Sequence, residues 1–280
     1  MEFSEDTVRR YRADGFVRVP GVLTADEVTA FREASEELLA EEAEIWAGGE
    51  QGEHVEVVYV TQAWRKHRAL RRLAMHPRIH AIAARLARLP LRLYTSEVLV
   101  KEPKRSTPTL VHDDETGLPL DGLSETLSAW VALGDVPVER GCLSYVPGSH
   151  LREESACQRH MNSFEEFADI DAIWPEFPWR SRVTVPLRAG DVAFHHCRTV
   201  HMAGANETAE RRVGHGVIFV DAGAAYRPGV QDQHLAHMRP GELLAGDEVL
   251  FPPVVAGSAF DRTDGSAAHR LTHPVPAPRH

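Results

Sequence analysis

Apolar residues in the first ninety positions recur mainly at helical spacing. The pattern predicts a short helix over residues 4–13, closed by Asp-Gly, and a short strand over 16–19. A longer helix is predicted over 24–46, because this stretch opens with Thr-Ala-Asp-Glu, the sequence of a capping box. A further helical stretch covers 69–89, and Pro77 within it predicts two helices, since proline lacks the helical N–H donor.

After residue 90 the pattern changes to short apolar or alternating runs separated by Gly, Pro and Asp. Such runs are typical of the strands and turns of an antiparallel sandwich or barrel. The predicted strands cover residues 91–100, 127–133, 142–146, 182–187, 191–195 and 213–220. The length of 280 residues fits one such unit, so we expect a single domain over 1–280 with a helical N-terminal part over about 1–90.

Two segments differ from this pattern. Residues 151–180 form a polar insertion that carries several aromatic residues. A long insertion of this kind is often a lid over a substrate, and the alternative is a surface excursion with a small cluster of its own. Residues 261–280 are rich in Pro, His and Ala, and we expect this tail to be frayed.

Charge and composition exclude several classes of partner. The chain has 31 Lys and Arg against 41 Asp and Glu, a net charge of −10, and nucleic-acid binders normally carry a basic excess. No apolar run approaches the roughly 18 residues that span a bilayer, so we expect no membrane partner. The acidic start has no signal core, and the three unpatterned cysteines suit a reducing compartment, so a cytoplasmic location is expected.

The sixteen histidines are the compositional excess, and one of them stands in a metal-binding pattern. On an extended backbone His112 and Asp114 would share a face while Asp113 points away. One imidazole and one carboxylate are two of the three ligands in the two-histidine, one-carboxylate site of non-haem iron(II) oxygenases. The tripeptide alone is a weak signal, and a third ligand would come from the later histidines.

Four features occur in a characteristic order along the chain. His112-x-Asp114 is followed by Trp130, and a Gly-initiated run then ends in Pro-Gly-Ser-His at His150. Gly-Asp-Val precedes a histidine-bearing strand, and Arg212 lies eleven residues after His201. With these features the sequence resembles the phytanoyl-CoA dioxygenase family of iron(II)- and 2-oxoglutarate-dependent oxygenases, from about residue 10 to about residue 253.

The resemblance implies a mainly β fold with packed helices, whose core is a double-stranded β-helix, the cupin-like jelly-roll. It implies that His112, Asp114 and His201 bind Fe(II), and that Arg212 grips the distal carboxylate of 2-oxoglutarate. A guanidinium suits this role, because it binds a carboxylate through two hydrogen bonds and keeps its charge.

The strand that follows Arg212 sets further expectations. Arg212 alternates with Gly214 and Gly216, which are small where a co-substrate must fit. Arg211 is out of phase with these positions and is expected to be a solvated surface charge. The family often has Ser two residues after the distal histidine, whereas this sequence has Ala203, so one hydrogen bond to 2-oxoglutarate is expected to be missing.

Other residues near the motifs have both a functional and a structural interpretation. Trp130 is either a core residue or a wall of the site, and Ser128 on its face either hydrogen-bonds a carboxylate or is a plain strand serine; both are candidates for cofactor binding. His195 and His196 are expected to be structural, unless their strand curves into the site and one of them faces substrate. His150 is expected to order its own turn.

The strand before the His-x-Asp pair carries Thr95, Glu97, Leu99 and Lys101 on one face. Contact with 2-oxoglutarate or substrate is one interpretation of these polar residues. The favoured expectation is that each of them faces water on an edge strand.

The implied activity is oxidation of an unactivated C–H bond of a small molecule, with O₂ consumed and 2-oxoglutarate converted to succinate and CO₂. Hydroxylation is the expected outcome, and desaturation, epimerisation and cyclisation are alternatives. The carboxylate of Asp114 disfavours halogenation, because relatives that halogenate lack it. By analogy with stand-alone family members, we expect a specialised metabolite or an amino-acid-like substrate, and a monomer or homodimer.

Two other classes of function stay open. A catalytically silent jelly-roll would bind metal or ligand without turnover, and only Ala203 favours it. A cupin-like metalloenzyme without 2-oxoglutarate, such as an isomerase, would have no use for Arg212 at this spacing.

Overall fold

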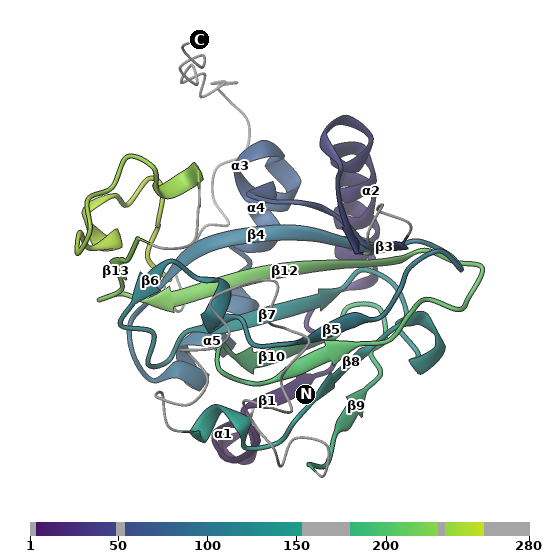
Figure 1. Cartoon of the computed structure of the whole chain (residues 1–280), viewed down its shortest axis with the longest axis horizontal. Coiled ribbons are helices and arrows are strands. Elements are labelled where there is room, and N and C mark those ends of the chain that lie inside the picture. The colour runs from purple at the N-terminus through teal and green to yellow at the C-terminus, as the bar shows by residue number, and fades with distance from the viewer. Residues whose placement is uncertain (1–3, 49–53, 153–179, 229–232, 255–280) are drawn as a thin grey trace.

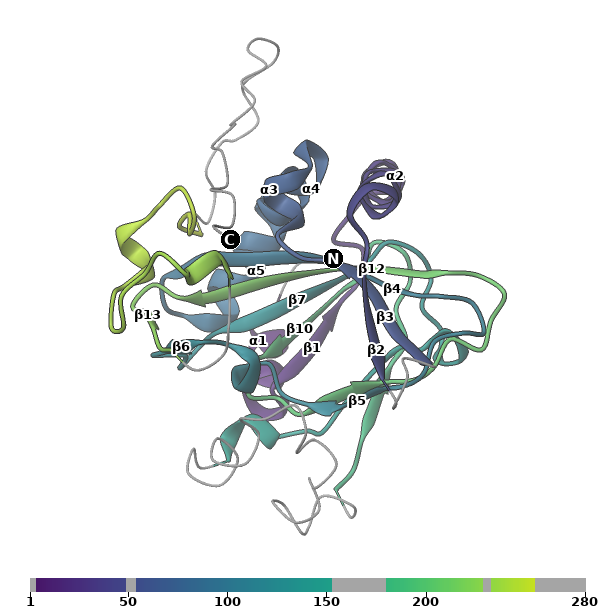
Figure 2. The ribbon, with the colours of Figure 1, turned by 45° about the horizontal axis from the view of Figure 1, so that its top comes forward.

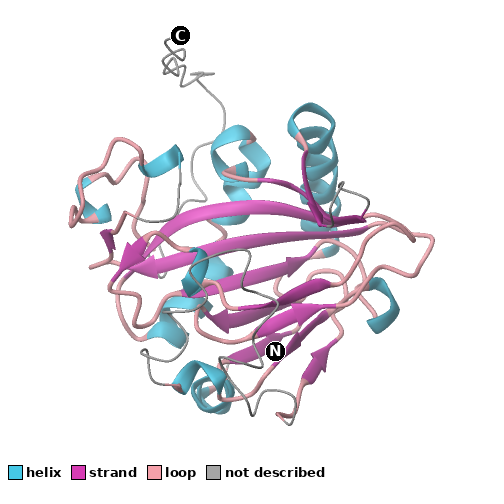
Figure 3. Cartoon of the chain, viewed as in Figure 1, coloured by secondary structure: helices cyan, strands magenta, loops and turns pink. Residues whose placement is uncertain are grey.

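The structure, a computed structural model, describes residues 4–48, 54–152, 180–228 and 233–254 (Figure 1). Its helices are α1 (Glu5–Asp14), α2 (Ala25–Glu42), α3 (Ala63–Lys66), α4 (Arg68–Ala74) and α5 (Pro77–Ala87). Its strands are β1 (Phe16–Val19), β2 (Glu44–Gly48), β3 (His54–Val60), β4 (Leu91–Lys101), β5 (Thr109–His112), β6 (Leu120–Asp121), β7 (Leu127–Ala132), β8 (Leu143–Tyr145), β9 (Val183–Val185), β10 (Val192–His196), β11 (His201–Ala203), β12 (Arg212–Asp221) and β13 (Ala225–Tyr226). Figure 3 shows the strands at the centre of the molecule with helices around them.

Two antiparallel sheets face each other across the interior (Figure 2). In the part of the chain that the structure describes, the larger sheet has the strand order β1-β10-β7-β12-β4-β3-β2 and the smaller one β5-β11-β8-β9. Strands β7, β10 and β12 of the larger sheet alternate along the sequence with β8 and β11 of the smaller sheet. This exchange between sheets is typical of a jelly-roll, and the predicted double-stranded β-helix core is confirmed.

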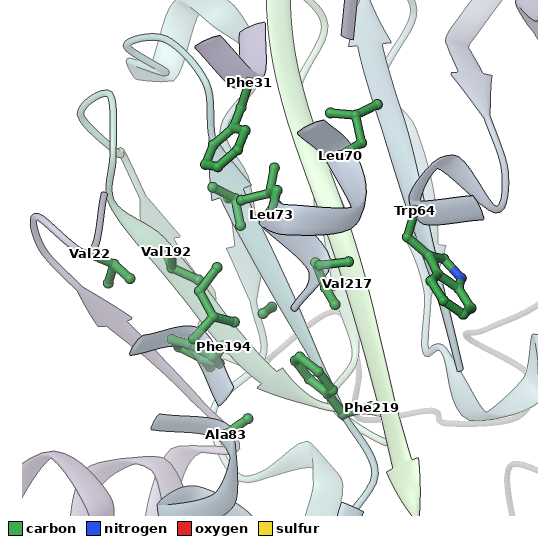
Figure 4. Close-up of a cluster of buried hydrophobic side chains, with 14 of the residues drawn as sticks. Val22, Phe31, Trp64, Leu70, Leu73, Ala83, Val192, Phe194, Val217 and Phe219 are labelled. Atoms are coloured by element: carbon green, nitrogen blue, oxygen red, sulfur yellow. The ribbon is translucent and has the colours of Figure 1, made fainter. Parts of the chain in front are cut away.

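The helices cover the outer face of the larger sheet, and the main hydrophobic core lies between these layers (Figure 4). Phe31 of α2 and Leu73 of α4 point towards the same layer as Phe194 of β10 and Phe219 of β12, and all four are buried. Full burial of one such side chain stabilises the fold by roughly 1.5–3 kcal/mol. The helices therefore stabilise the larger sheet from its outer face, and the site is built on its inner face.

Three helix boundaries confirm the sequence prediction. Ser4 caps α1 by accepting from the backbone N–H of Thr7. Thr24 and Glu27 form both halves of the capping box at the start of α2. Pro77 is the first residue of α5, where its missing N–H has no helical partner to lose.

The predicted helix over 24–46 is wrong in its last part, because α2 ends at Glu42. The backbone becomes extended at Ala43, and the last turn of α2 has no basic residue to complement the helix dipole. Ile45 then pairs with Val58 of β3, a strand that the sequence analysis did not predict. Pairing with β3 thus converts the end of the predicted helix into an edge strand.

A second hydrophobic cluster lies between the two sheets and surrounds the space where the site is built. It joins Trp130 and Ala193 of the larger sheet to Tyr145 and Ala203 of the smaller sheet. Of the predicted insertion over 151–180, residues 153–179 lie outside the described residues, as does the predicted frayed tail over 261–280.

Candidate metal centre and co-substrate site

His112, Asp114 and His201 form a cluster at the end of the smaller sheet. Among the described residues, they are the group whose potential ligand atoms all lie within 4.8 Å of one another. His112 ends β5 and His201 begins β11, and the two are direct partners in the antiparallel ladder. Their ring centroids are 4.1 Å apart. The register of the sheet therefore brings together two histidines that are far apart in the sequence.

Asp114 reaches this cluster by a different route from the one predicted. Strand β5 ends at His112, and Asp114 has a right-handed helical backbone (φ −74°, ψ −32°) at the start of the 3₁₀ turn Glu115–Gly117. The expectation that an extended strand places the two side chains on one face is wrong. Asp113 does point elsewhere, as predicted, and it forms a buried ion pair with Arg152. The turn, anchored by this pair, directs Asp114 towards the histidines.

Both histidines of the cluster are oriented by the same local contact. Nδ1 of His112 lies 2.7 Å from the carbonyl oxygen of Leu110, and Nδ1 of His201 lies 2.9 Å from that of Thr199. A carbonyl can only accept, so Nδ1 carries a proton in each ring, and Nε2 is the nitrogen left to bind a metal. A hydrogen bond of this kind is the usual support of a metal-binding histidine.

The protonation states also suit metal binding. Burial raises the pKa of Asp114, but its interactions with His201 and His195 outweigh burial and hold the pKa below its usual value. Burial lowers the pKa of His201 well below its usual value, helped by His112 and His195 and opposed by Asp114. At neutral pH the carboxylate is therefore ionised and the imidazole neutral, the forms that bind metals.

Two side chains of the larger sheet hold one oxygen of Asp114. The Oγ of Ser128 donates to Oδ2 at 2.5 Å, and Nε2 of His195 lies 3.0 Å from the same atom. The other oxygen, Oδ1, lies 3.6 Å from Nε2 of His201. His195, for which a structural role was expected, thus contacts the cluster through Asp114. His196 is structural, as predicted, and its Nε2 donates to a loop carbonyl.

The Arg212 side chain is buried next to Trp130, with its guanidinium carbon 5.2 Å from the centroid of the indole ring. Its Nη1 donates to the carbonyl of Gly141 at 2.7 Å, while its Nε has no hydrogen-bond partner among the described residues. Burial lowers the pKa of Arg212 to about 10, which leaves the group charged at neutral pH. A buried charge in this state is costly unless an anion joins it.

Strand β7 connects the candidate metal-binding cluster to the buried arginine. Ser128, which contacts Asp114, and Trp130, which contacts Arg212, are alternate residues of β7. Alternate residues share one face of a strand and lie about 7 Å apart. The two halves of the candidate site are therefore adjacent on the inner face of the larger sheet.

The small residues of β12 do not leave the space that was predicted. A Cβ at Gly214 would overlap the ring of Trp130, so the indole already fills the room above this glycine. At Gly216 a Cβ would approach only a methyl group of Leu99, at 3.5 Å. The expectation that Gly214 leaves space for the co-substrate is thus wrong. Its missing side chain makes room for the ring of Trp130.

The expectation that the polar face of β4 meets water is wrong for two of its residues. Lys101 is 0% exposed and Thr95 4%. The reason is the sheet order, because β4 lies between β12 and β3 and is not an edge strand. Lys101 is the direct ladder partner of Arg212 and donates its Nζ to the carbonyl of Thr107 at 2.5 Å.

Arg211 lies outside the site, as its phase predicted. Its side chain is 39% exposed and forms ion pairs with Glu36 of α2 and Glu102. It is a paired surface charge rather than a solvated one. His150 does not bond to its own turn, contrary to expectation, because its Nε2 contacts the carbonyl of Arg12 in α1.

The residues present fit a divalent iron ion and a dicarboxylate co-substrate. Two imidazoles and one carboxylate are the ligand set of non-haem iron(II) oxygenases, and His112, Asp114 and His201 would supply them here. The unpartnered Nε of the buried Arg212 supplies a donor for an anionic ligand. Fold, ligand set and buried guanidinium together define the class of jelly-roll oxygenases that use iron and 2-oxoglutarate.

Comparison with known proteins identifies the family. The model of the phytanoyl-CoA dioxygenase family matches residues 11–214, and the chain belongs to this family. A curated relative, mouse (Mus musculus) phytanoyl-CoA dioxygenase domain-containing protein 1, is 23% identical over 274 residues, which cover 81% of this chain and 93% of the relative. The predicted family and the predicted use of iron, O₂ and 2-oxoglutarate are confirmed.

Two solved structures are similar over nearly their whole length. The non-haem α-ketoglutarate-dependent carbocyclase SnoK from nogalamycin biosynthesis is 58% identical, with a TM-score of 0.84, over 91% of this chain and 97% of the other. The epimerase SnoN, in complex with Fe³⁺, α-ketoglutarate and nogalamycin RO, is 44% identical, with a TM-score of 0.79, over 90% and 98%. No helix in the described part of this chain is long and apolar enough to cross a bilayer.

Proposed function

We propose that His112, Asp114 and His201 hold the iron of this oxygenase and that Arg212 binds the distal carboxylate of 2-oxoglutarate. The observation that carries the proposal is that Ser128 contacts Asp114 of the cluster while Trp130, two residues further along β7, contacts the buried guanidinium of Arg212. With its groups bound, such a site supplies oxidation of an unactivated C–H bond, coupled to conversion of 2-oxoglutarate to succinate and CO₂.

The remaining residues of the site prepare it for these groups. Trp130 packs on the guanidinium of Arg212 and restricts its orientation, which lowers the entropy lost when a carboxylate binds. Ser128 was a candidate for cofactor binding, and its contact with Asp114 supports a different role, that of orienting a metal ligand. Trp130 and Arg212 are buried, which keeps water from the guanidinium and strengthens its electrostatic attraction for an anionic ligand.

For the outcome of the reaction we propose ring closure on a compound of the nogalamycin type. The carbocyclase SnoK supports this proposal, since it is 58% identical to this chain over 97% of its own length. The epimerase SnoN is less similar, at 44%. Hydroxylation, which the sequence favoured, stays a prediction, as do the cytoplasmic location and the monomeric or homodimeric state.

The product mass separates these outcomes. The enzyme with Fe(II), O₂ and 2-oxoglutarate is incubated with nogalamycin RO and with biosynthetic precursors of nogalamycin, and products are analysed by mass spectrometry and NMR. Ring closure removes two hydrogen atoms from the substrate, hydroxylation adds one oxygen atom, and epimerisation leaves the formula unchanged. A product with one added oxygen and no new ring would contradict the cyclase proposal and support hydroxylation.

Consumption of 2-oxoglutarate separates an enzyme from a silent binding protein. We expect succinate to form with the wild-type chain and to fall to background in His201→Ala. Bound iron without any succinate, in the presence of every tested substrate, would favour the silent jelly-roll instead.

A further inference from the structure

His195 occupies a position that the ligand set does not explain. It lies on β10, directly opposite Ser128 of β7, and its side chain is 3% exposed. Its ring centroid lies 4.5 Å from that of His201, yet its Nε2 points at Oδ2 of Asp114, 3.0 Å away. His195 is therefore a third imidazole beside the cluster. Its Nε2 contacts Asp114 and is not directed at the proposed metal.

The other nitrogen of His195 meets a buried tyrosine. The hydroxyl of Tyr145, on β8 of the smaller sheet, lies 3.3 Å from Nδ1 of His195. Tyr145 is 0% exposed and stacks on Phe16 of β1 at 4.5 Å between ring centroids. Packing on Phe16 fixes the tyrosine ring, and the tyrosine hydroxyl in turn meets the imidazole of His195.

The ionised carboxylate of Asp114 decides which atom donates in its hydrogen bond with His195. An ionised carboxylate accepts and cannot donate, so Nε2 of His195 carries the proton that reaches Asp114. On the other side of the ring, Nδ1 of His195 and the hydroxyl of Tyr145 share the hydrogen bond. The result is a buried chain of hydrogen bonds, from Tyr145 through His195 to Asp114, which joins the two sheets across the site.

We propose that His195, set by Tyr145, is a positioning residue that keeps Asp114 as a one-oxygen metal ligand. The inference rests on the metal site proposed above. Ser128 and His195 together engage Oδ2, and Oδ1 is left on the side of His201. Engagement of Oδ2 would favour binding of iron through the other oxygen alone and would leave room at the metal for the co-substrate and O₂.

The alternative, that His195 only fills the core, makes a different prediction about substitutions. A packing role needs the shape of the ring and would be satisfied by phenylalanine. The positioning role needs the Nε2 donor, which glutamine can supply and phenylalanine cannot. The neighbouring His196, which is equally buried but bonds to the carbonyl of Ser124, provides a matched control on the same strand.

The test compares His195→Phe, His195→Gln, Tyr145→Phe and the control His196→Phe by anaerobic titration with Fe(II), before and after addition of 2-oxoglutarate. We expect His195→Phe to weaken Fe(II) binding by roughly 10–100-fold, the usual effect of losing the support of a ligand, and to shift the visible band of the iron–2-oxoglutarate complex. His195→Gln should recover most of the affinity, Tyr145→Phe should lose less than His195→Phe, and His196→Phe should behave as wild type.

Two results would overturn the inference. One is wild-type Fe(II) affinity with an unchanged band in His195→Phe. The other is an equal loss in His195→Phe and His195→Gln when circular dichroism shows both to be folded. If His195→Phe does not fold, the Fe(II) affinities of His195→Gln and Tyr145→Phe test the inference. A large loss in His195→Gln, or no loss in Tyr145→Phe, would then overturn it. Absence of the band in the wild-type protein, with Fe(II) affinity unchanged in His112→Ala, would instead refute the proposed metal site itself.

Discussion

The indole of Trp130 is packed between Gly214 and the guanidinium of Arg212. The guanidinium carbon lies 5.2 Å from the ring centroid, and a Cβ at position 214 would overlap the ring. The glycine therefore leaves room for the indole against β12, and the indole packs against the arginine. Gly214 thus shapes the proposed binding site for the 2-oxoglutarate carboxylate, although it has no side chain.

This arrangement predicts different effects for two neighbouring glycines of β12. Gly214→Ala should displace Trp130, reduce the free energy of unfolding by about 1–3 kcal/mol and raise the apparent Kd for 2-oxoglutarate. Gly216→Ala should leave the Kd nearly unchanged, because its Cβ would meet only Leu99 at an ordinary contact distance. Titration of both variants with 2-oxoglutarate checks the difference, and equal Kd values would show that Trp130 does not position Arg212.

The two adjacent arginines should differ in their effect on 2-oxoglutarate. Loss of a charge-assisted pair with a buried carboxylate costs about 2–5 kcal/mol. Since about 1.4 kcal/mol corresponds to a tenfold change, Arg212→Ala should weaken 2-oxoglutarate binding by roughly thirtyfold or more. Iron affinity should change little. Arg212→Lys should recover only part of the loss, because an ammonium lacks the planar pair of donors.

Arg211→Ala is the control for this prediction. Arg211 pairs with Glu36 and Glu102 at the surface, so its loss should change the affinity for 2-oxoglutarate by less than about threefold. A larger effect from Arg211 than from Arg212 in the same titration would place the co-substrate on the other face of β12. No effect from either arginine would remove 2-oxoglutarate from this part of the fold.

Asp114→Gly removes the carboxylate ligand and leaves Ser128 and His195 without their acceptor. We expect weaker iron binding and loss of substrate oxidation, with at best feeble incorporation of halide, because no pocket for chloride has been shaped. Product analysis by mass spectrometry in the presence of chloride measures both outcomes. Undiminished oxidation by this variant would show that Asp114 does not bind the metal.

His215 gives the fold a pH dependence that is separate from catalysis. It is 0% exposed, neither ring nitrogen has a hydrogen-bond partner among the described residues, and burial lowers its pKa to about 3. The neutral ring is therefore favoured in the folded state, so stability is complete above the unfolded pKa near 6.5 and falls as the pH drops towards 3.

The variant His215→Leu should remove this dependence. Its free energy of unfolding, relative to wild type, should increase by up to about 1.4 kcal/mol for each pH unit below 6. Urea unfolding at several pH values between neutrality and pH 4 measures the difference. A constant difference between the two proteins over this range would show that His215 takes up a proton without cost.

The parts of the fold that were predictable from sequence depend on local signals. The capping box at Thr24 and the proline at 77 mark helix ends that the neighbouring residues alone decide. The end of α2 was missed because Ile45 is held by β3, a partner that no local pattern names. For the same reason Lys101 was expected to face water, since only the order of strands buries β4.

In the site, too, features set by local sequence were predictable and features set by tertiary contacts were not. The spacing of Arg212 after His201 and the phase of Arg211 predicted which arginine is buried. The place of His195 was not predictable, because its contact with Asp114 depends on the pairing of β10 with β7 and on a turn after β5. The turn in the backbone at Asp114 is a tertiary feature that a His-x-Asp motif does not specify.

We propose that one site holds iron and 2-oxoglutarate together. The most direct test of this proposal is anaerobic addition of Fe(II) and then 2-oxoglutarate to the purified protein, followed by visible spectroscopy. A weak metal-to-ligand charge-transfer band should appear only with both present, persist in His196→Ala and vanish in His201→Ala. Bound Fe(II) without such a band in the wild-type protein, or an undiminished band in His201→Ala, would contradict the account.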